Sequence, residues 1–444
     1  MSDKRPAKAG LLLFLLAAPA FASTRVVLLH FSDYHSHALP FYSEGRDDQG
    51  GIARAIGYLD REHRRGALVF SGGDMVNKGA PSWSDKYGCA EWPWLNGIAS
   101  AMALGNHDPD YGSDAFAKCR SEIRYPILSA NTNGFQRSAV FTANGIRVGV
   151  FALAGDDFPT LVRTPGFAFS DRVAAARDVV RELHEKADVV VLIGHETLDE
   201  DFALAREVPG IDVILGTHSH LKHELAKIEG TNTWFISPFQ YLTYISRVEL
   251  TFDGHKLVRV NGSLVRVDSS MRADPKIAQR VATMERALEK DPQYAPLFEP
   301  FGYVKSAMPV ERLGAQTVEL MRWLTSSDFA ISTTSSFRQD LPAGRITMEM
   351  LRNAMPYDNE IVTATLTGEQ LQRVIGFKGD VSYYTPVAID PAKTYRVATT
   401  DYLAKVSAYK TFFGEVQKSG MHVRDELRKT LRDYCCRTTA NPSP

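Results

Sequence analysis

Short apolar runs rich in β-branched residues recur through the first part of the chain. The clearest are residues 26–31, 67–70, 148–153, 189–193 and 211–215. Such runs are typical of strands that are buried on both faces of a sheet. Apolar residues then recur every three or four positions in the segment from Ser170 to Lys186, which predicts an amphipathic helix between two of these strands.

This alternation of strands and helices predicts a layered α/β domain, which we place at residues 23–268. Residues 274–289 follow with the pattern of a surface helix. Three prolines, Pro292, Pro296 and Pro300, then indicate an extended connector, because proline interrupts regular structure. We therefore assign residues 269–302 to a helix and a connector that joins two domains.

The remainder of the chain predicts a second, smaller unit of the α+β class at residues 303–436, followed by a tail at 437–444. A helical pattern covers residues 316–324, and several short strand patterns follow it. Residues 347–354 predict a further helix that begins at a Thr347 cap and turns Met350 and Leu351 inward.

The N-terminus has the pattern of an export signal. Lys4, Arg5 and Lys8 precede an apolar run at residues 11–18, and Ala20-Phe21-Ala22 has the small-x-small pattern of a cleavage site. We predict that residues 1–22 are removed near Ala22-Ser23 and that the mature protein is periplasmic or secreted. An uncleaved N-terminal anchor is the alternative. The apolar run is shorter than the ~20 residues of a spanning helix, and no later segment reaches that length, so stable membrane insertion is not expected.

The composition is that of a large globular protein, with 444 residues, 44% of them hydrophobic and 23% charged. This length favours two domains. The formal net charge of −1 does not favour nucleic acid or an anionic membrane surface as a partner. The sequence does not identify protein partners.

Four cysteines, Cys89, Cys119, Cys435 and Cys436, allow three pairings in an exported protein. We favour the Cys89–Cys119 pair, because the other two cysteines are adjacent and lie far away at the C-terminus. Their spacing does not indicate a metal site built from thiolates.

Polar motifs follow several of the predicted strands. They are Asp33-Tyr-His35, Gly73-Asp74, Gly105-Asn-His-Asp108, Gly194-His195-Glu196 and Gly216-Thr-His-Ser-His220. Ligand sites in α/β sheets gather at the carboxyl ends of strands. One histidine in such a place is more often a hydrogen-bonded core or surface residue, but five motifs together indicate a common site. We expect the glycine beside most of them to let the backbone turn tightly and aim each side chain into one cavity.

The side chains in these motifs predict a site for two divalent metal ions. Imidazole, carboxylate and amide groups without cysteine suit Mn, Zn, Fe or Co. A single tetrahedral zinc uses three or four protein ligands, so a set of seven favours two ions ~3.5–4 Å apart with a bridging carboxylate.

In this order the motifs resemble those of the calcineurin-type metallophosphoesterases, specifically the 5′-nucleotidase and UDP-sugar hydrolase family. The resemblance continues through Leu128-Ser-Ala-Asn131, Ile346-Thr347, Met355-Pro-Tyr-Asp-Asn359 and Leu366-Thr-Gly368, and so covers nearly the whole mature chain. It implies a four-layer α/β/β/α catalytic domain, followed by a 5′-nucleotidase C-terminal-type domain that binds the leaving group and closes over the metals.

The resemblance also implies the role of each site residue. One metal is expected on Asp33, His35 and His220, the other on Asn106, His195 and His218, and Asp74 is expected to bridge them. His107 is the implied catalytic residue, which stabilises the transition state or protonates the leaving oxygen, and Asp110 is implied to orient it. Asp108 remains an alternative for the role of Asp110.

The substrate-binding loops depart from the family pattern. Thr334-Ser-Ser-Phe-Arg338 replaces a loop that contains Asn-Gly-Gly and ends in arginine. Arg338 is therefore the one predicted contact of this loop for a phosphate or carboxylate, with an exposed, salt-bridging arginine as the alternative.

The nucleoside-binding features are altered as well. Tyr402 falls where one of two base-stacking rings belongs in the family, but Val406-Ser-Ala408 replaces the Gly-Gly-Asp that binds the ribose. The loop of the second ring is shortened and runs from Phe377 through Gly379 to Tyr383 and Tyr384. These two tyrosines are either a platform for a base or buried core residues.

Three hypotheses of function follow. The first is an exported binuclear-metal phosphoesterase that hydrolyses a small-molecule phosphate ester by attack of a metal-bridging hydroxide, as a 5′-nucleotidase, a nucleotide-sugar hydrolase or a non-nucleotide phosphomonoesterase. The second is a periplasmic relative with altered chemistry, such as a thiosulfohydrolase, which acts on a sulfur substrate carried by a partner protein. The third is a non-catalytic binding protein, which the presence of all seven predicted ligands disfavours.

Overall fold

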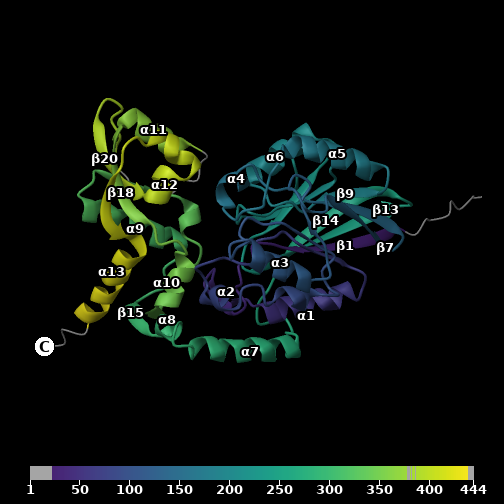
Figure 1. Cartoon of the computed structure of the whole chain (residues 1–444), viewed down its shortest axis with the longest axis horizontal. Coiled ribbons are helices and arrows are strands. Elements are labelled where there is room, and N and C mark those ends of the chain that lie inside the picture. The colour runs from purple at the N-terminus through teal and green to yellow at the C-terminus, as the bar shows by residue number, and fades with distance from the viewer. Residues whose placement is uncertain (1–22, 378–380, 382, 386, 439–444) are drawn as a thin grey trace, which may run out of the picture.

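The computed structural model describes residues 23–377, 381, 383–385 and 387–438. The predicted signal peptide, Gly379 and the last six residues of the predicted tail lie outside the described residues. Figure 1 shows a larger lobe built from the N-terminal part of the chain and a smaller lobe built from the C-terminal part, with helix α7 (Pro275–Glu289) below them. None of the helices in the described ranges combines the length and apolar character that a bilayer crossing requires.

Two six-stranded sheets form the centre of the larger lobe. The first has the order β14 (Lys256–Arg266), β13 (Tyr244–Asp253), β1 (Thr24–Phe31), β4 (Leu68–Ser71), β5 (Ala101–Ala103), β6 (Ile127–Leu128). The second has the order β11 (Lys222–Lys227), β12 (Trp234–Pro238), β10 (Val213–Leu215), β9 (Val189–Leu192), β8 (Ile146–Phe151), β7 (Ser138–Ala143). Strands β1, β4, β5 and β6 run parallel in the first sheet, as do β8, β9, β10 and β12 in the second. The carboxyl ends of the parallel strands in each sheet therefore lie at the same edge of that sheet.

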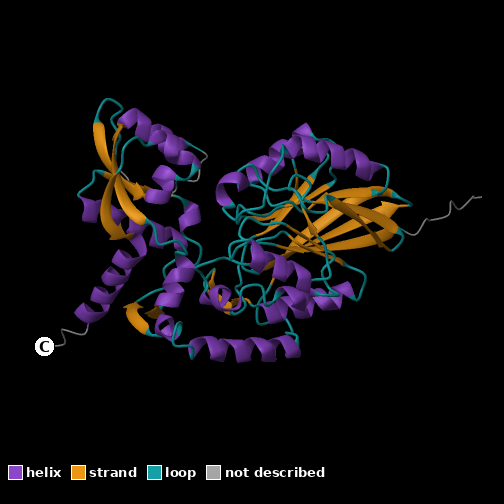
Figure 2. Cartoon of the chain, in the orientation of Figure 1, coloured by secondary structure: helices purple, strands orange, loops and turns teal. Residues whose placement is uncertain are grey.

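Helices cover the outer face of each sheet, and the inner faces pack on one another (Figure 2). Helices α1 (Ile52–His63), α3 (Ser113–Glu122) and α7 share one core with the first sheet. Helices α5 (Arg172–His184) and α6 (Leu198–Glu207) share another with the second sheet. A third core joins the two sheets and includes Phe70 and Val150. These four layers confirm the predicted α/β/β/α architecture.

The predicted strands of this lobe match observed strands to within two residues at each end. Helix α5 begins after an N-cap aspartate, Asp171, whose side chain accepts a hydrogen bond from the backbone N–H of Ala174. The predicted surface helix is α7, which also buries Val281 and Leu288 in the core that α1 shares. The connector is not wholly extended, because Pro296 lies in the first turn of a short helix, α8 (Ala295–Phe298). Proline is tolerated there, since the backbone N–H groups of the first turn have no acceptor within the helix.

The smaller lobe contains a five-stranded sheet, as expected for an α+β domain. Its order is β19 (Tyr383–Tyr384), β16 (Phe329–Ser332), β20 (Thr394–Thr400), β18 (Glu360–Thr367), β21 (Gln417–His422). Its helices are α9 (Val310–Thr325), α10 (Met348–Ala354), α11 (Gly368–Gly376), α12 (Asp401–Lys405), α13 (Val423–Thr438). The predicted helix at 316–324 is the second part of α9. Thr347 caps α10 through the N–H of Met350, and Leu351 is fully buried, which confirms that prediction.

Shorter elements complete the described chain. They are β2 (Pro40–Ser43), β3 (Arg46–Gly50), α2 (Ser82–Tyr87), α4 (Phe158–Leu161), β15 (Pro300–Val304), β17 (Gly344–Thr347) and the 3-10 turns η1 (Trp92–Leu95), η2 (Thr334–Ser336) and η3 (Ala408–Phe412). A disulfide joins Cys89 to Cys119 at a Cα–Cα distance of 5.9 Å, which confirms the favoured pairing. The exact residue boundaries of the two domains stay a prediction.

Polar contacts hold α10 against the larger lobe. Glu349 of α10 accepts a hydrogen bond from the backbone N–H of Ser82 at 2.9 Å. Arg352, one turn later, pairs with Asp85 at 3.1 Å. Because these contacts involve α2 and the residues before it, the smaller lobe is positioned beside the segment that follows β4.

Glu91 lies fully buried in the larger lobe and provides a test of the packing there. Its carboxylate accepts hydrogen bonds from Tyr34 and Trp83, and burial raises its pKa from 4.5 to about 7. Ionising this side chain therefore costs more in the folded protein than in the unfolded chain, so its contribution to stability falls as pH rises from about 4.5 and levels off above about 7.

We expect Glu91→Gln to abolish this pH-dependent contribution of Glu91 to stability. The melting-temperature difference between about pH 5 and about pH 8 should be smaller in the variant than in the wild type. An equal difference would contradict the conclusion that burial raises the pKa of Glu91.

Candidate metal centre

The predicted metal ligands come together at the carboxyl ends of the parallel strands. Strands β1, β4 and β5 of the first sheet lead to Asp33, His35, Asp74 and Asn106, while β9 and β10 of the second lead to His195, His218 and His220. Five of these residues are fully or almost fully buried: Asp33, His35, Asp74, Asn106 and His195. The side chains from both sheets thus meet between the two sheet edges.

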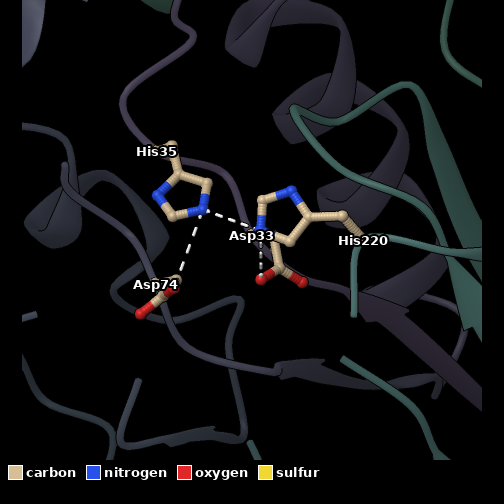
Figure 3. A group of neighbouring side chains, drawn as sticks. All are labelled: Asp33, His35, Asp74 and His220. Atoms are coloured by element: carbon tan, nitrogen blue, oxygen red, sulfur yellow. Dashed lines mark hydrogen bonds and ion pairs between the residues drawn. The ribbon is translucent and has the colours of Figure 1, made fainter. Parts of the chain in front are cut away.

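One group consists of Asp33, His35, Asp74 and His220, with one potential ligand atom from each within 4.8 Å of the others (Figure 3). His220 Nε2 lies 3.2 Å from Asp33 Oδ1 and 3.2 Å from His35 Nε2. His35 Nε2 lies 3.6 Å from Asp74 Oδ2. Two imidazole nitrogens and two carboxylates that converge in this way provide a set of ligands for a cation.

A second group consists of Asp74, His195 and His218. His195 Nε2 lies 3.2 Å from Asp74 Oδ2, the same oxygen that faces His35. Asp74 therefore belongs to both groups, which is the position that a bridging carboxylate needs.

The residues present fit two divalent cations. Three of the predicted ligand atoms, Asp33 Oδ1, Asn106 Oδ1 and His195 Nε2, are buried and have no hydrogen-bond partner in the part of the chain that the structure describes. An unpaired buried polar group costs about 1–3 kcal/mol, a cost that a bound cation removes. Burial would raise the pKa of Asp74, but the charges of His195, His107 and His35 hold it well below its usual range, so the shared carboxylate is ionised.

The backbone of this centre adopts conformations that ordinary residues avoid. Five of the seven predicted ligands have a positive φ: Asp33 (50°), His35 (46°), Asp74 (52°), His218 (54°) and His220 (51°). A left-handed conformation costs on the order of 1 kcal/mol for each such residue, and it persists only where the surroundings impose it. The ligands themselves therefore make the sharp turns.

The glycines of the motifs serve mainly another purpose than the one expected. Gly73 does turn the chain, with φ 90°. Gly105 and Gly216 lie outside the left-handed region and instead allow close packing, because a Cβ on Gly105 would lie 2.1 Å from the backbone nitrogen of Asp74 and one on Gly216 would lie 2.3 Å from the ring of Phe235. The expectation that glycine would aim the side chains is therefore correct at Gly73 and wrong at these two positions.

His107 and Asp110 form a pair beside the metal ligands. His107 Nδ1 lies 2.7 Å from Asp110 Oδ2, and the backbone N–H of His107 donates to Asp74 Oδ1 at 2.8 Å. The alternative partner, Asp108, is occupied elsewhere, since its carboxylate accepts hydrogen bonds from the backbone of Gly105 and Met75. The geometry thus pairs His107 with Asp110, and the catalytic roles of both stay a prediction.

The smaller lobe places Arg338 against this centre. Its Nη1 lies 2.7 and 2.8 Å from the two ring nitrogens of His220, and Gln240 donates a hydrogen bond to its backbone carbonyl. Among the described residues no carboxylate forms an ion pair with Arg338, so the alternative of a salt-bridging surface arginine is not what the structure shows. Contact with substrate remains a prediction.

Tyr402, Tyr384 and Tyr357 are partly exposed tyrosines of the smaller lobe. Burial and the charges of Tyr357 and Asp157 raise the pKa of Tyr402, whose side chain keeps 41% of its surface exposed. Tyr384 is also 41% exposed, so the interpretation of it as a buried core residue is wrong; the side chain of Tyr383 lies outside what the structure describes.

Two further residues reach the site without having been assigned a role from the sequence. The hydroxyl oxygen of Tyr357, 37% exposed, lies 3.3 Å from His107 Nε2. Asp157 lies 3.0 Å from His218 Nε2. Tyr357 belongs to the Met-Pro-Tyr-Asp-Asn motif, which was noted as part of the family resemblance, whereas Asp157 belongs to no motif.

Comparison with known proteins accounts for both lobes. Residues 26–222 match the calcineurin-like phosphoesterase family, and residues 305–388 match the 5′-nucleotidase C-terminal domain. The protein UshA of Salmonella pullorum is 24% identical to this chain, over 89% of this chain and 90% of its own length.

Solved structures share the two-lobed fold. A 5′-nucleotidase precursor from Thermus thermophilus covers 93% of this chain and 97% of its own with a TM-score of 0.75 at 22% identity. The sulfate thiohydrolase SoxB, also from Thermus thermophilus, covers 92% of this chain and 94% of its own with a TM-score of 0.74 at 18% identity. At these identities the likeness extends to the fold and does not distinguish between the two chemistries.

The close approach of Gly105 to Asp74 leads to a test of the centre. Because the added methyl group would meet backbone atoms, which cannot move aside cheaply, we expect Gly105→Ala to displace Asp74 and abolish the binding of both metal ions. Gly376→Ala is the matched control, since a Cβ at Gly376 meets nothing within 4 Å. The measurement is metal content by mass spectrometry after dialysis against manganese. Two ions retained in the Gly105 variant would show that this contact does not position the shared ligand.

Proposed function

The chain belongs to the 5′-nucleotidase family of calcineurin-like metallophosphoesterases, and we propose that it is an exported hydrolase of small-molecule phosphate esters, with nucleotides or nucleotide sugars as the substrate class. The observation that carries the proposal is the pair of ligand groups that share Asp74. Enzymes of this family work with two divalent metal ions, and the Asp and His cluster matches that requirement. Export rests on the predicted signal peptide.

The ions, when bound, supply an activated water and neutralise charge on the phosphoryl oxygens. In the proposal, His107 acts on the other side of the reaction and gives the proton of its Nε2 to the leaving oxygen. Burial would lower the pKa of His107, but its neighbours Tyr357, Asp74 and Asp110 raise it well above 6.5, which favours the protonated ring that this role needs. Asp110 accepts the hydrogen bond of Nδ1–H and keeps Nε2 directed away from itself.

Residues of the smaller lobe complete the proposed substrate site. Arg338 is placed at the first ligand group, where its guanidinium suits the oxygens of a phosphate. The hydroxyl of Tyr357 faces the nitrogen of His107 that would give up its proton, which is where the leaving oxygen would arrive. Tyr402 offers a half-exposed ring for a base. The family's Gly-Gly-Asp is absent, so recognition of a nucleoside would depend on these other groups.

The role of His107 predicts a separation of catalysis from metal binding. We expect His107→Ala to lower kcat by at least about 100-fold, the size of a general acid contribution, while the protein keeps two metal ions. His255→Ala is the control, because His255 is an exposed histidine that pairs with Asp188 on the surface. Steady-state kinetics and metal analysis of the same preparations decide the matter. A kcat within a few-fold of the wild type would remove His107 from the mechanism.

The substrate class is tested with the mature protein and a panel of compounds. We expect metal-dependent release of phosphate or nucleoside monophosphate from nucleoside monophosphates or UDP-glucose, abolished by a chelator and restored by manganese or zinc. Activity on an aryl phosphate alone would indicate a phosphomonoesterase with another leaving group. Sulfate release from a protein-linked thiosulfonate, without phosphoesterase turnover, would replace the proposal with the thiosulfohydrolase alternative.

A further inference from the structure

Two of the four predicted histidine ligands, His35 and His195, share one arrangement of their ring nitrogens. His35 Nδ1 lies 3.2 Å from the carbonyl oxygen of Val76, and His195 Nδ1 lies 2.7 Å from that of Gly72. A backbone carbonyl oxygen accepts the Nδ1 proton in both cases, which leaves the lone pair on Nε2, the nitrogen that faces the other ligands. His220 differs, because its Nδ1 contacts both the side-chain oxygen of Gln240 and the donor Nη1 of Arg338.

His218 has the opposite arrangement and a charged partner. Its Nε2 lies 3.0 Å from Oδ2 of Asp157, so its Nδ1 is the nitrogen available to a metal. The partner of His218 is therefore the carboxyl group of an aspartate, whereas His35 and His195 have neutral backbone carbonyl groups as partners. A carboxylate makes the imidazole a more basic ligand than a carbonyl does and adds negative charge next to one of the two sites only.

The fold holds Asp157 in place without engaging its carboxylate elsewhere. Asp157 precedes helix α4, but its side chain makes no capping hydrogen bond, and its buried Oδ1 has no hydrogen-bond partner among the described residues. The preceding residues are fixed to the segment around His195, because Gly155 N–H donates to the carbonyl of His195 at 3.0 Å and Asp156 N–H donates to Glu200 at 2.9 Å.

Arg172 links the same loop to the residues that follow β9. Its side chain is 5% exposed and lies 2.9 Å from the fully buried Glu196, and it also lies 3.3 Å from Asp156 of the loop, whose side chain is 64% exposed. Gly155 leaves the necessary space, since a Cβ there would lie 3.1 Å from Oδ1 of Asp157. The loop is therefore tied to the residues that follow β9, and its position relative to His218 is set by the tertiary structure.

We propose that Asp157 is a positioning residue for the second metal site: its carboxylate accepts the Nε2 proton of His218, fixes the tautomer with a lone pair on Nδ1, and raises the affinity of the divalent cation that His218, His195 and Asp74 hold. This inference rests on the proposed function, because it assumes that two ions bind. It deepens the proposed function by giving the two sites different affinities for the cation. The site that contains His35 and His220 has no carboxylate among the described residues in the equivalent place.

The test is a titration of the metal-free protein with cobalt(II), followed by calorimetry and by visible absorption. We expect Asp157→Ala and Asp157→Asn to bind the first ion as the wild type does and the second about 10- to 100-fold more weakly, with a changed absorption spectrum for the second ion. The melting temperature of the metal-free variants should equal that of the metal-free wild type. Asp156→Asn is the matched control, because it alters the neighbouring carboxylate, which contacts Arg172 and not His218.

Each outcome of this experiment supports or overturns the inference. Two ions bound by Asp157→Ala with wild-type affinities would overturn it and leave the proposed function intact. Equal weakening in Asp156→Asn would also overturn it, because the loop and not the carboxylate would then be responsible. A wild type that binds fewer than two ions would overturn both the binuclear site and the inference.

Discussion

The buried carboxylate of Asp74 must be balanced by positive charge, and its surroundings meet that demand from several directions. It faces His35 and His195 through one oxygen and accepts the backbone N–H of His107 through the other. A carboxylate in a site that excludes water is stable only if it is paired, and here its partners are imidazoles that are themselves suited to hold cations. The two ligand groups, the His107–Asp110 pair and the packing of Gly105 all meet at this one residue.

The scaffold that supports this arrangement is the edge where two sheets meet. Each sheet contributes ligands at the ends of its parallel strands, and the core between the sheets keeps those ends at a constant separation. The left-handed backbone of residues such as Asp33 and His218 is tolerated there, because the strands that precede these residues and the buried packing around them hold the backbone in that conformation. The strain lies in the turns that carry the ligands.

The smaller lobe adds groups that the sheets do not supply. Arg338 and Tyr357 approach His220 and His107 respectively, so the smaller lobe contacts both the first ligand group and the His107–Asp110 pair of the larger lobe. The contacts of α10 with the segment after β4 hold these residues beside the centre. In the proposed function, the larger lobe carries the chemistry and the smaller lobe selects the leaving group. The residues for these two roles are far apart in the chain and lie close together in the fold.

The sequence by itself determined the strands of the larger lobe and the polar motifs near their ends, while the four layers and the two sets of ligands followed from the family resemblance. Apolar runs of strand length, several of them followed within a few residues by His or Asp, are local features, and parallel strands bring their ends to the same edge wherever they lie in the chain. The pairing of His107 with Asp110 is equally local, since they are three positions apart in the chain. Only the tertiary structure decided which acceptor each imidazole has and which residues of the second lobe arrive at the site. Asp157 and His218 are 61 positions apart, and Tyr357 and His107 are 250 apart. Contacts at such separations depend on how loops and lobes pack, for which no periodic pattern exists in the sequence.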